Sequence, residues 1–228
     1  LVEIQKIPTG NNLIVEKGYG INSIIDSLKN RNNNKFLTIL KLKYLFESTN
    51  IIPGRYEIKP SMTYAELIED VFEGNLQQFR FTIIEGSVAK DALKKLRQII
   101  KNNNLNFQIS SKTLEIFSKE SLILPDTYFF TDRQQLERLM INQKIRLDNI
   151  LTRLWKNKPK DNPLKSINEA LILASIVERE AAVEWERAQI SSVFLSRIRD
   201  GWRLDADPTL IYGYYGDFSK KITKENLK

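Results

Sequence analysis

The second half of this chain is organised around the stretch SINEALILASIVERE, which covers residues 166–180. Ser166 belongs to the residue types that cap helix N-termini, and Glu169 stands at the matching position of a capping box. The apolar block Ala170–Ala174 follows directly. The stretch therefore predicts a helix over Ile167–Glu180 that carries a glutamate close to its end.

Glu178 finishes an apolar stripe on this predicted helix. Helical spacing places it in line with Leu171 and Ala174 on one face. A carboxyl group in an apolar pocket holds its proton more tightly than one in water, as a general acid near neutral pH must. Periodicity alone favours the alternative, an ordinary ion pair of Glu178 with Arg179 or Arg187. Both interpretations stay open at this point.

Further candidate site residues lie in the segment Arg203–Gly213, which is rich in polar and aromatic side chains. A helix is predicted before it over Trp185–Asp200, ended by Gly201 as the C′ residue. Asp and Pro at helix starts predict a turn or helix N-terminus at residues 207–209. We predict that the segment forms a cleft wall whose polar side chains bind sugar hydroxyls or N-acetyl groups, namely Asp205, Asp207, Thr209 and Tyr212. Core packing with a helix cap is an equally weighted alternative.

The first part of the chain predicts a small unit of mixed strands and helices, with a boundary near Gln77. The whole chain is thus expected to be of the α+β class, because the second part is mostly helical. The predicted strands are Val2–Ile7, Arg55–Ile58 and Phe79–Ile84, and the predicted helices are Ile21–Leu28, Phe36–Phe46, Thr63–Gly74, Val88–Lys101 and Asp132–Lys156.

Composition limits the possible chemistry. The 228 residues include no Cys and no His, which excludes nucleophile systems that depend on histidine and argues against a zinc site. Acid–base chemistry must therefore fall to Asp, Glu, Lys or Tyr, and we expect no metal and no cofactor. The net charge of +7 favours anionic partners. Nucleic acid ranks last among them, since no basic helix or interleaved aromatic–basic strand is evident.

Several spaced motifs resemble one family. The strongest is LASIVERE at residues 173–180, followed by ER at 186–187, VFLSRI at 193–198 and RLDADPTLIYG at 203–213. Upstream, PGRY at 53–56, EG at 73–74 and 85–86, and LPDTY at 124–128 keep the same order and approximate spacing. Together they resemble the endolytic murein transglycosylases (MltG, or YceG-like, proteins) over nearly the whole chain.

The resemblance implies a LysM-like subdomain over residues 1–77 and a transglycosylase catalytic domain over residues 78–228 with a lysozyme-like catalytic helix. It implies Glu178 as the catalytic residue, which cleaves peptidoglycan between MurNAc and GlcNAc within nascent strands and leaves 1,6-anhydroMurNAc ends. It also implies a cell-membrane location through an N-terminal anchor absent from this chain, with the catalytic domain on the outer or periplasmic face beside wall synthases such as penicillin-binding proteins.

Two residues depart from the family pattern. Ala181 stands where Thr is usual, and Asp205 stands where Gln is usual, so a charge replaces an amide. The resemblance also implies a further segment beyond Lys228 that completes the catalytic domain. We expect Glu186 and Arg187 to form a structural salt bridge near the site.

Two alternative functions remain at the level of sequence. One is a non-catalytic peptidoglycan-binding or scaffold protein. The other is a hydrolytic muramidase that uses Glu178 with Asp205 or Asp207 as a carboxylate pair.

Overall fold

The computed structural model describes residue 7, residues 12–29, residues 42 and 44, residues 50–120, residues 122–221 and residue 223. These residues form helices and two small two-stranded sheets, in agreement with the α+β class expected from the sequence. Within these ranges, no helix is both long and apolar enough to cross a bilayer.

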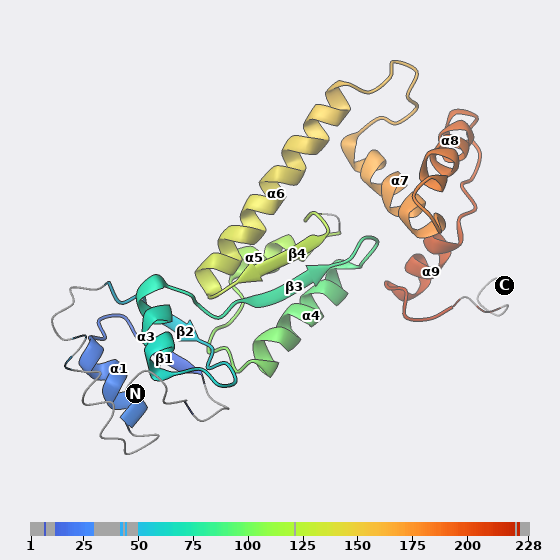
Figure 1. The fold of residues 1–228 in the computed structure, drawn as a ribbon. Helices are drawn as coiled ribbons and strands as arrows, with labels where there is room; N and C mark the ends of the chain where they lie inside the picture. The colour runs from blue at the N-terminus through green and yellow to red at the C-terminus, as the bar shows by residue number, and fades with distance from the viewer. Residues whose placement is uncertain are drawn as a thin grey trace. The chain divides into compact units, whose positions relative to one another are not determined.

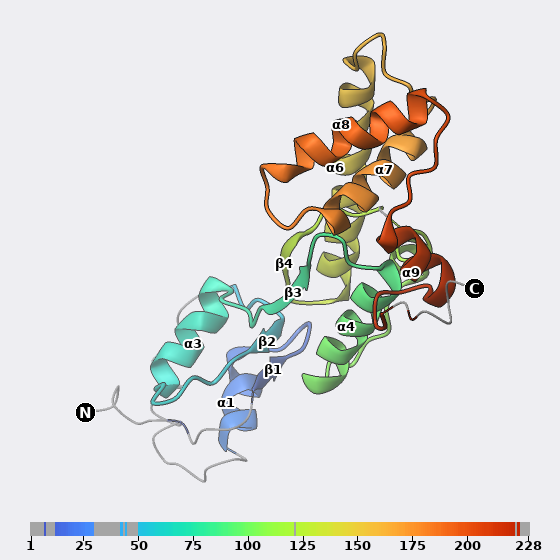
Figure 2. The same cartoon turned by 90° about the vertical axis from the view of Figure 1, so that its right-hand side faces the viewer.

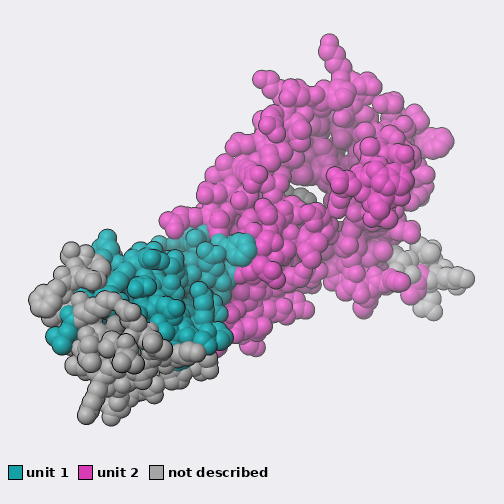
Figure 3. Space-filling model, in the orientation of Figure 1, with its two compact units in different colours: residues 1–79, 129–135 teal, residues 80–128, 136–228 magenta. Residues whose placement is uncertain are grey.

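The chain packs into two compact units, coloured separately in Figure 3. Unit 1 comprises residues 1–79 and 129–135, and unit 2 comprises residues 80–128 and 136–228. This division describes how the residues pack. The LysM-like and catalytic domains over residues 1–77 and 78–228 stay a prediction.

Unit 1 holds the first sheet and two helices (Figure 1). Strand β1 (Leu13–Val15) pairs antiparallel with β2 (Gly54–Tyr56), with Leu13 opposite Tyr56. Helix α1 (Ile21–Lys29) and helix α3 (Tyr64–Glu73) contribute to the same core, and α3 contacts β2. The largest fully buried side chains of this unit are Leu13, Ile24, Ile25, Leu28, Tyr56, Tyr64, Leu67, Ile68 and Phe130.

Capping defines both ends of α3. Thr63 accepts a hydrogen bond from the Glu66 amide at 3.2 Å, and the Glu66 carboxylate accepts one from the Thr63 amide at 2.7 Å. This is the capping box predicted from the sequence. Gly74 ends the helix in the left-handed region, with φ of 77°.

The second sheet is formed by β3 (Phe79–Ile83) and β4 (Asp126–Phe130), and most of its residues belong to unit 2. The Thr82 and Thr127 hydroxyls lie 3.0 Å apart, and the Phe81 and Tyr128 rings lie 6.4 Å apart. The residue number falls along β3 as it rises along the facing β4, so the two strands run antiparallel. Two helices separate the strands in sequence, α4 (Ala89–Asn102) and α5 (Ser111–Ile116).

The remaining helices of unit 2 follow β4 in the order α6 (Arg133–Lys156), α7 (Ile167–Glu180), α8 (Glu186–Arg199) and α9 (Asp207–Tyr215). Helix α7 contacts both α8 and α9, and the three lie together in both views (Figures 1 and 2). Their shared core is formed by Leu164, Leu173, Ile176, Val177, Phe194 and Ala206.

Helix α7 has the bounds that its sequence predicted. Ser166 caps it by accepting from the Glu169 amide at 3.1 Å. The Glu169 carboxylate accepts a hydrogen bond from the Lys165 amide at 2.7 Å. In a capping box it would accept from the amide of the N-cap residue Ser166, so the observed donor lies one residue earlier. Gly201 follows α8 as predicted, with φ of 70°.

Other predictions from the sequence need correction. Three short elements were not expected from the sequence, namely β1, α5 and β4, and the two strands depend on pairing with segments distant in sequence. Segment 207–215 is a helix whose N-cap is Ala206, so Asp207 lies inside the first turn and does not cap it. The strand Val2–Ile7 and the helix Phe36–Phe46 lie largely outside the described residues.

Tyr56 makes unit 1 sensitive to alkaline pH. Its hydroxyl donates to the Ile52 carbonyl at 2.5 Å, and burial together with Asp70 raises its pKa to about 12. The unfolded chain loses this proton near the ordinary value of about 10, so stability is intact below pH 10 and falls as the pH rises toward 12. In Tyr56→Phe, we expect the free energy of unfolding to fall by about 1 kcal/mol at pH 8. The gap to wild type should narrow at pH 11 in denaturant titrations. An equal gap at both pH values would refute this account.

Candidate functional site

A cavity of about 650 Å³ lies within unit 2. Its lining is mainly apolar and comes from the β3–α4 turn, the segment before β4, one face of α7, and α9. The polar and charged groups in this lining are Glu85, Ser87, Lys119, Glu120, Asn168, Ser175, Glu178, Arg179, Thr209 and Tyr212. Such a mixture of apolar surface and a few converging polar groups is typical of ligand sites.

The two faces of α7 have different roles. Leu173, Ile176 and Val177 are buried in the core shared with α8. Leu171, Ala174 and Glu178 line the cavity, as does Ile176. The apolar stripe predicted from the sequence is thus the cavity face of the helix. Glu178 stands where this face meets the β3–α4 turn.

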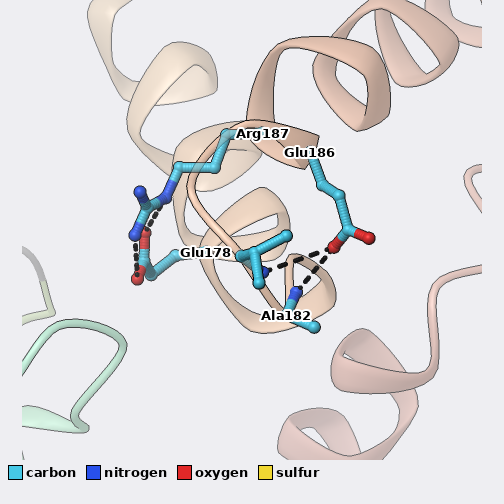
Figure 4. A network of polar contacts seen from close by, with 5 residues as sticks. Glu178, Ala182, Glu186 and Arg187 are labelled. Atoms are coloured by element: carbon cyan, nitrogen blue, oxygen red, sulfur yellow. Dashed lines mark hydrogen bonds and ion pairs between the residues drawn. The ribbon is translucent and has the colours of Figure 1, made fainter.

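Arg187 binds the carboxylate of Glu178 through a bidentate salt bridge (Figure 4). Its Nε donates to Oε2 at 3.0 Å, and its Nη2 donates to Oε1 at 3.2 Å. The Glu178 side chain is 28% exposed and the Arg187 side chain 42%. Hydrogen bonding to Glu178, and then its charge, raise the pKa of Arg187 above the ordinary value, so the guanidinium stays charged.

This contact resolves the alternative left open by periodicity. Glu178 both pairs with Arg187 and lines the cavity, so an ion pair and a place in the cavity coexist. Hydrogen bonds between a carboxylate and a guanidinium are stronger than those between neutral groups. Two parallel bonds from one guanidinium also fix the plane of the carboxylate. The site therefore contains an oriented carboxylate.

Glu186 has a different partner from the one predicted. Its Oε2 accepts hydrogen bonds from the amides of Ala182 at 3.0 Å and Val183 at 3.3 Å (Figure 4). The predicted Glu186–Arg187 salt bridge is wrong, because Glu186 holds the turn between α7 and α8 while Arg187 holds Glu178. By fixing this turn, Glu186 sets the direction in which α8 starts and so where Arg187 lies.

Gly86 forms the wall closest to Glu178. It has φ of 66°, a conformation that favours glycine. A Cβ atom placed there would lie 3.2 Å from Cδ of Arg179 and 3.6 Å from Cγ of Glu178. The absence of a side chain at residue 86 therefore lets the β3–α4 turn approach the stem of the candidate catalytic glutamate.

Two of the four predicted substrate-binding residues line the cavity from α9. The Thr209 hydroxyl donates to the Ala206 carbonyl at 2.6 Å. The Tyr212 hydroxyl lies 3.2 Å from Oε1 of Glu120, and the other oxygen of Glu120 accepts from the Ala89 amide at 2.8 Å. Glu120 thus joins the start of α4 to α9 across the cavity lining.

The other two predicted substrate-binding residues, Asp205 and Asp207, are exposed and are not among the described residues that line the cavity. Asp205 has φ of 46°, in the left-handed region. It lies between Leu204, whose carbonyl accepts a hydrogen bond from Arg197, and the buried N-cap Ala206. Its place in the fold is that of a sharp bend leading into α9.

Two contributors to the site were not predicted from the sequence. Glu120 stands in a segment without periodicity, and its pairing with Tyr212 spans 92 positions, so no local signal indicated it. Gly86 was quoted only within a family motif, although a glycine beside a predicted helix start was the available signal. Arg179 is an exposed residue, and its guanidinium lies 3.5 Å from the ring centroid of Phe218.

Comparison with known proteins identifies the family. Residues 13–228 match the YceG-like family. This chain is a YceG-like protein. A Bacillus subtilis (strain 168) protein named endolytic murein transglycosylase is 24% identical over 228 residues, covering 88% of this chain and 62% of that protein. This YceG-like chain therefore spans less than two thirds of its curated relative.

Solved structures give a further similarity. The crystal structure of a YceG-like protein from Listeria monocytogenes shares 21% sequence identity with this chain at a TM-score of 0.45. The comparison covers 96% of this chain and 79% of the Listeria chain.

Gly86→Ala tests the close wall. We expect a loss of about 1–2 kcal/mol in unfolding free energy from the left-handed backbone, together with displacement of the Arg179 and Glu178 side chains. Gly201→Ala is the matched control, because its φ is 70° and open space surrounds the added Cβ. Both variants should lose similar stability in denaturant titrations, but Gly86→Ala alone should shift the side-chain NMR signals of Glu178 and Arg179. Unshifted signals in Gly86→Ala would contradict this role of Gly86.

Two substitutions test whether the backbone conformation or the side chain of Asp205 matters. Asp205→Gly relaxes the left-handed conformation and should keep the stability of the protein. Asp205→Val should cost about 1–2 kcal/mol, because a branched Cβ is strained there. Denaturant titration of both variants provides the measurement, and an equal loss in the two would contradict this role of the backbone.

Proposed function

We propose that this chain is part of an endolytic peptidoglycan lytic transglycosylase. It cuts the bond between MurNAc and GlcNAc within nascent glycan strands and leaves 1,6-anhydroMurNAc ends, with Glu178 as the general acid and then the general base. The observation that carries the proposal is the oriented Glu178 carboxylate in a largely apolar cavity, in a chain of the YceG-like family. The name of the Bacillus relative agrees with this chemistry.

The reaction needs one carboxyl group in two protonation states. Protonated Glu178 donates to the glycosidic oxygen while positive charge develops at C1 of MurNAc. The resulting carboxylate accepts the proton of the C6 hydroxyl of the same sugar. That oxygen attacks C1 and closes the anhydro ring. Because the nucleophile is intramolecular, neither water nor a second carboxylate takes part.

The surroundings of Glu178 support this reaction over hydrolysis. A muramidase that used Asp205 or Asp207 would need that carboxylate to face the sugar, and both lie outside the lining. Glu120 does line the cavity, but its two oxygens already accept from the Ala89 amide and meet the Tyr212 hydroxyl. Thr209 and Tyr212 are the better placed of the four predicted sugar-binding residues.

The setting of the reaction is part of the same proposal. Residues 1–77 act as a LysM-like unit, and residues 78–228 carry the catalytic domain with a lysozyme-like helix at α7. The whole protein acts at the cell membrane, on its outer or periplasmic face, where an N-terminal anchor holds it beside wall synthases. Its cuts end the growth of glycan strands.

Glu178→Gln tests the catalytic assignment. The amide keeps the shape of the side chain but can act neither as a general acid nor as a general base, so glycan cleavage should fall by about 10²–10⁴-fold. The matched control is Glu180→Gln, which changes a glutamate of the same helix outside the cavity lining. Mass spectrometry of products from purified sacculi measures both the rate and the chemical nature of the new ends.

The products also separate the alternatives. Anhydro ends from wild type and the Glu180 variant, with few from the Glu178 variant, support the transglycosylase. Reducing MurNAc ends would make the protein a hydrolase. Glycan binding without cleavage in wild type, unchanged in Glu178→Gln, would make it a scaffold protein.

A further inference from the structure

Arg179 follows the candidate catalytic glutamate on α7, and its side chain lines the cavity together with Phe218. The guanidinium carbon lies over the Phe218 ring, 3.5 Å from its centroid, which is the distance of a stacked pair. Stacking on an aromatic face leaves the N–H groups of a guanidinium able to donate to a carboxylate. Phe218 therefore supports a charged donor group at the cavity without using its hydrogen bonds.

No hydrogen bond or ion pair joins Arg179 to another residue within the part of the chain that the structure describes. The carboxylates of the cavity lining have other contacts. Glu178 is bound by Arg187, and Glu120 binds the start of α4 and helix α9. Glu85 acts on Arg187, whose pKa it helps to raise. The donors of Arg179 are thus available to an anion that enters the cavity.

Gly86 brings Arg179 and Glu178 to the same wall of the cavity. A Cβ atom at Gly86 would lie 3.2 Å from Cδ of Arg179 and 3.6 Å from Cγ of Glu178. The stems of both side chains therefore lie within 3.6 Å of one point. A sugar bound with its C1 atom at Glu178 lies next to a guanidinium as well as a carboxyl.

The proposed reaction does not by itself distinguish the two kinds of glycosidic bond that alternate along a strand. MurNAc and GlcNAc both have a C6 hydroxyl that could close an anhydro ring, so the choice of bond requires a feature that only one sugar has. MurNAc carries a lactyl group on its C3 oxygen, with a carboxyl that is free or joined to an acidic peptide, whereas GlcNAc is neutral. A planar guanidinium matches a carboxylate through two parallel N–H donors.

We infer that Arg179 is a specificity-determining residue that binds the carboxylate carried by MurNAc, and so places the C1 atom of this sugar at Glu178. The inference rests on the proposed function and identifies the part of the substrate that the site recognises. Lys119 also lines the cavity, but its ammonium is a point charge without a plane that matches a carboxylate. No bond forms or breaks at Arg179.

The disaccharide GlcNAc–MurNAc tests this recognition without cleavage, because it lacks the MurNAc–GlcNAc bond. Isothermal titration calorimetry compares three forms, which carry a free lactyl carboxylate, a neutral lactyl methylamide, or a peptide with its own carboxylates. We expect wild type to bind one or both acidic forms about 10-fold more tightly than the methylamide. The difference between the two acidic forms shows whether the lactyl carboxylate or the peptide is the source of the charge.

Three variants assign this preference to one side chain. Arg179→Gln should lose it, because the amide has no charge. Arg179→Lys should keep part of it, because the charge remains but the planar pair of donors does not. Arg199→Gln is the matched control and should keep all of it, since Arg199 lies on α8 outside the cavity lining and pairs with Asp161.

Equal binding of the three forms by wild type, binding of none of them, or an unchanged preference in Arg179→Gln would overturn the inference. Cleavage of purified sacculi is measured in parallel. Anhydro ends from a wild type without the preference would leave the proposed function standing and overturn the recognition by Arg179. A preference that Arg179→Gln abolishes, in a protein that cuts no glycan, would support the recognition and refute the proposed function.

Discussion

Successive residues of an α-helix turn about its axis by a fixed angle, so burying one face of α7 determines where the opposite face points. Leu173, Ile176 and Val177 pack into the core shared with Phe194 of α8 and with Ala206. Leu171 and Glu178 are then directed into the cavity. A shift of the helix by one residue would place a charge in this core, which is costly without a partner. The position of the candidate acid is thus enforced by apolar packing behind it.

The turn between α7 and α8 determines which charged group faces Glu178. Glu186 binds the amides of Ala182 and Val183, and the helix that follows presents Arg187 to Glu178. Glu186 thus fixes the backbone of the turn, whereas Arg187 fixes the orientation of the Glu178 carboxylate.

The sequence predicted those features that depend on local chemistry. The caps at Thr63 and Ser166, the bounds of α7 and the glycine after α8 all follow from side chains within a few residues of one another. The partner of Arg187 was left between possibilities, because periodicity describes one helix and the pair joins two. Glu120 could not be predicted at all, since its contact with Tyr212 depends on how segments distant in sequence fold together.

The link made by Glu120 bears on how firmly the wall of the cavity is held. Glu120 joins the start of α4 to α9 through hydrogen bonds of one side chain, each worth about 1 kcal/mol net. Losing both of these bonds would cost far less than unpacking the core behind α7, so this link is the weaker of the two.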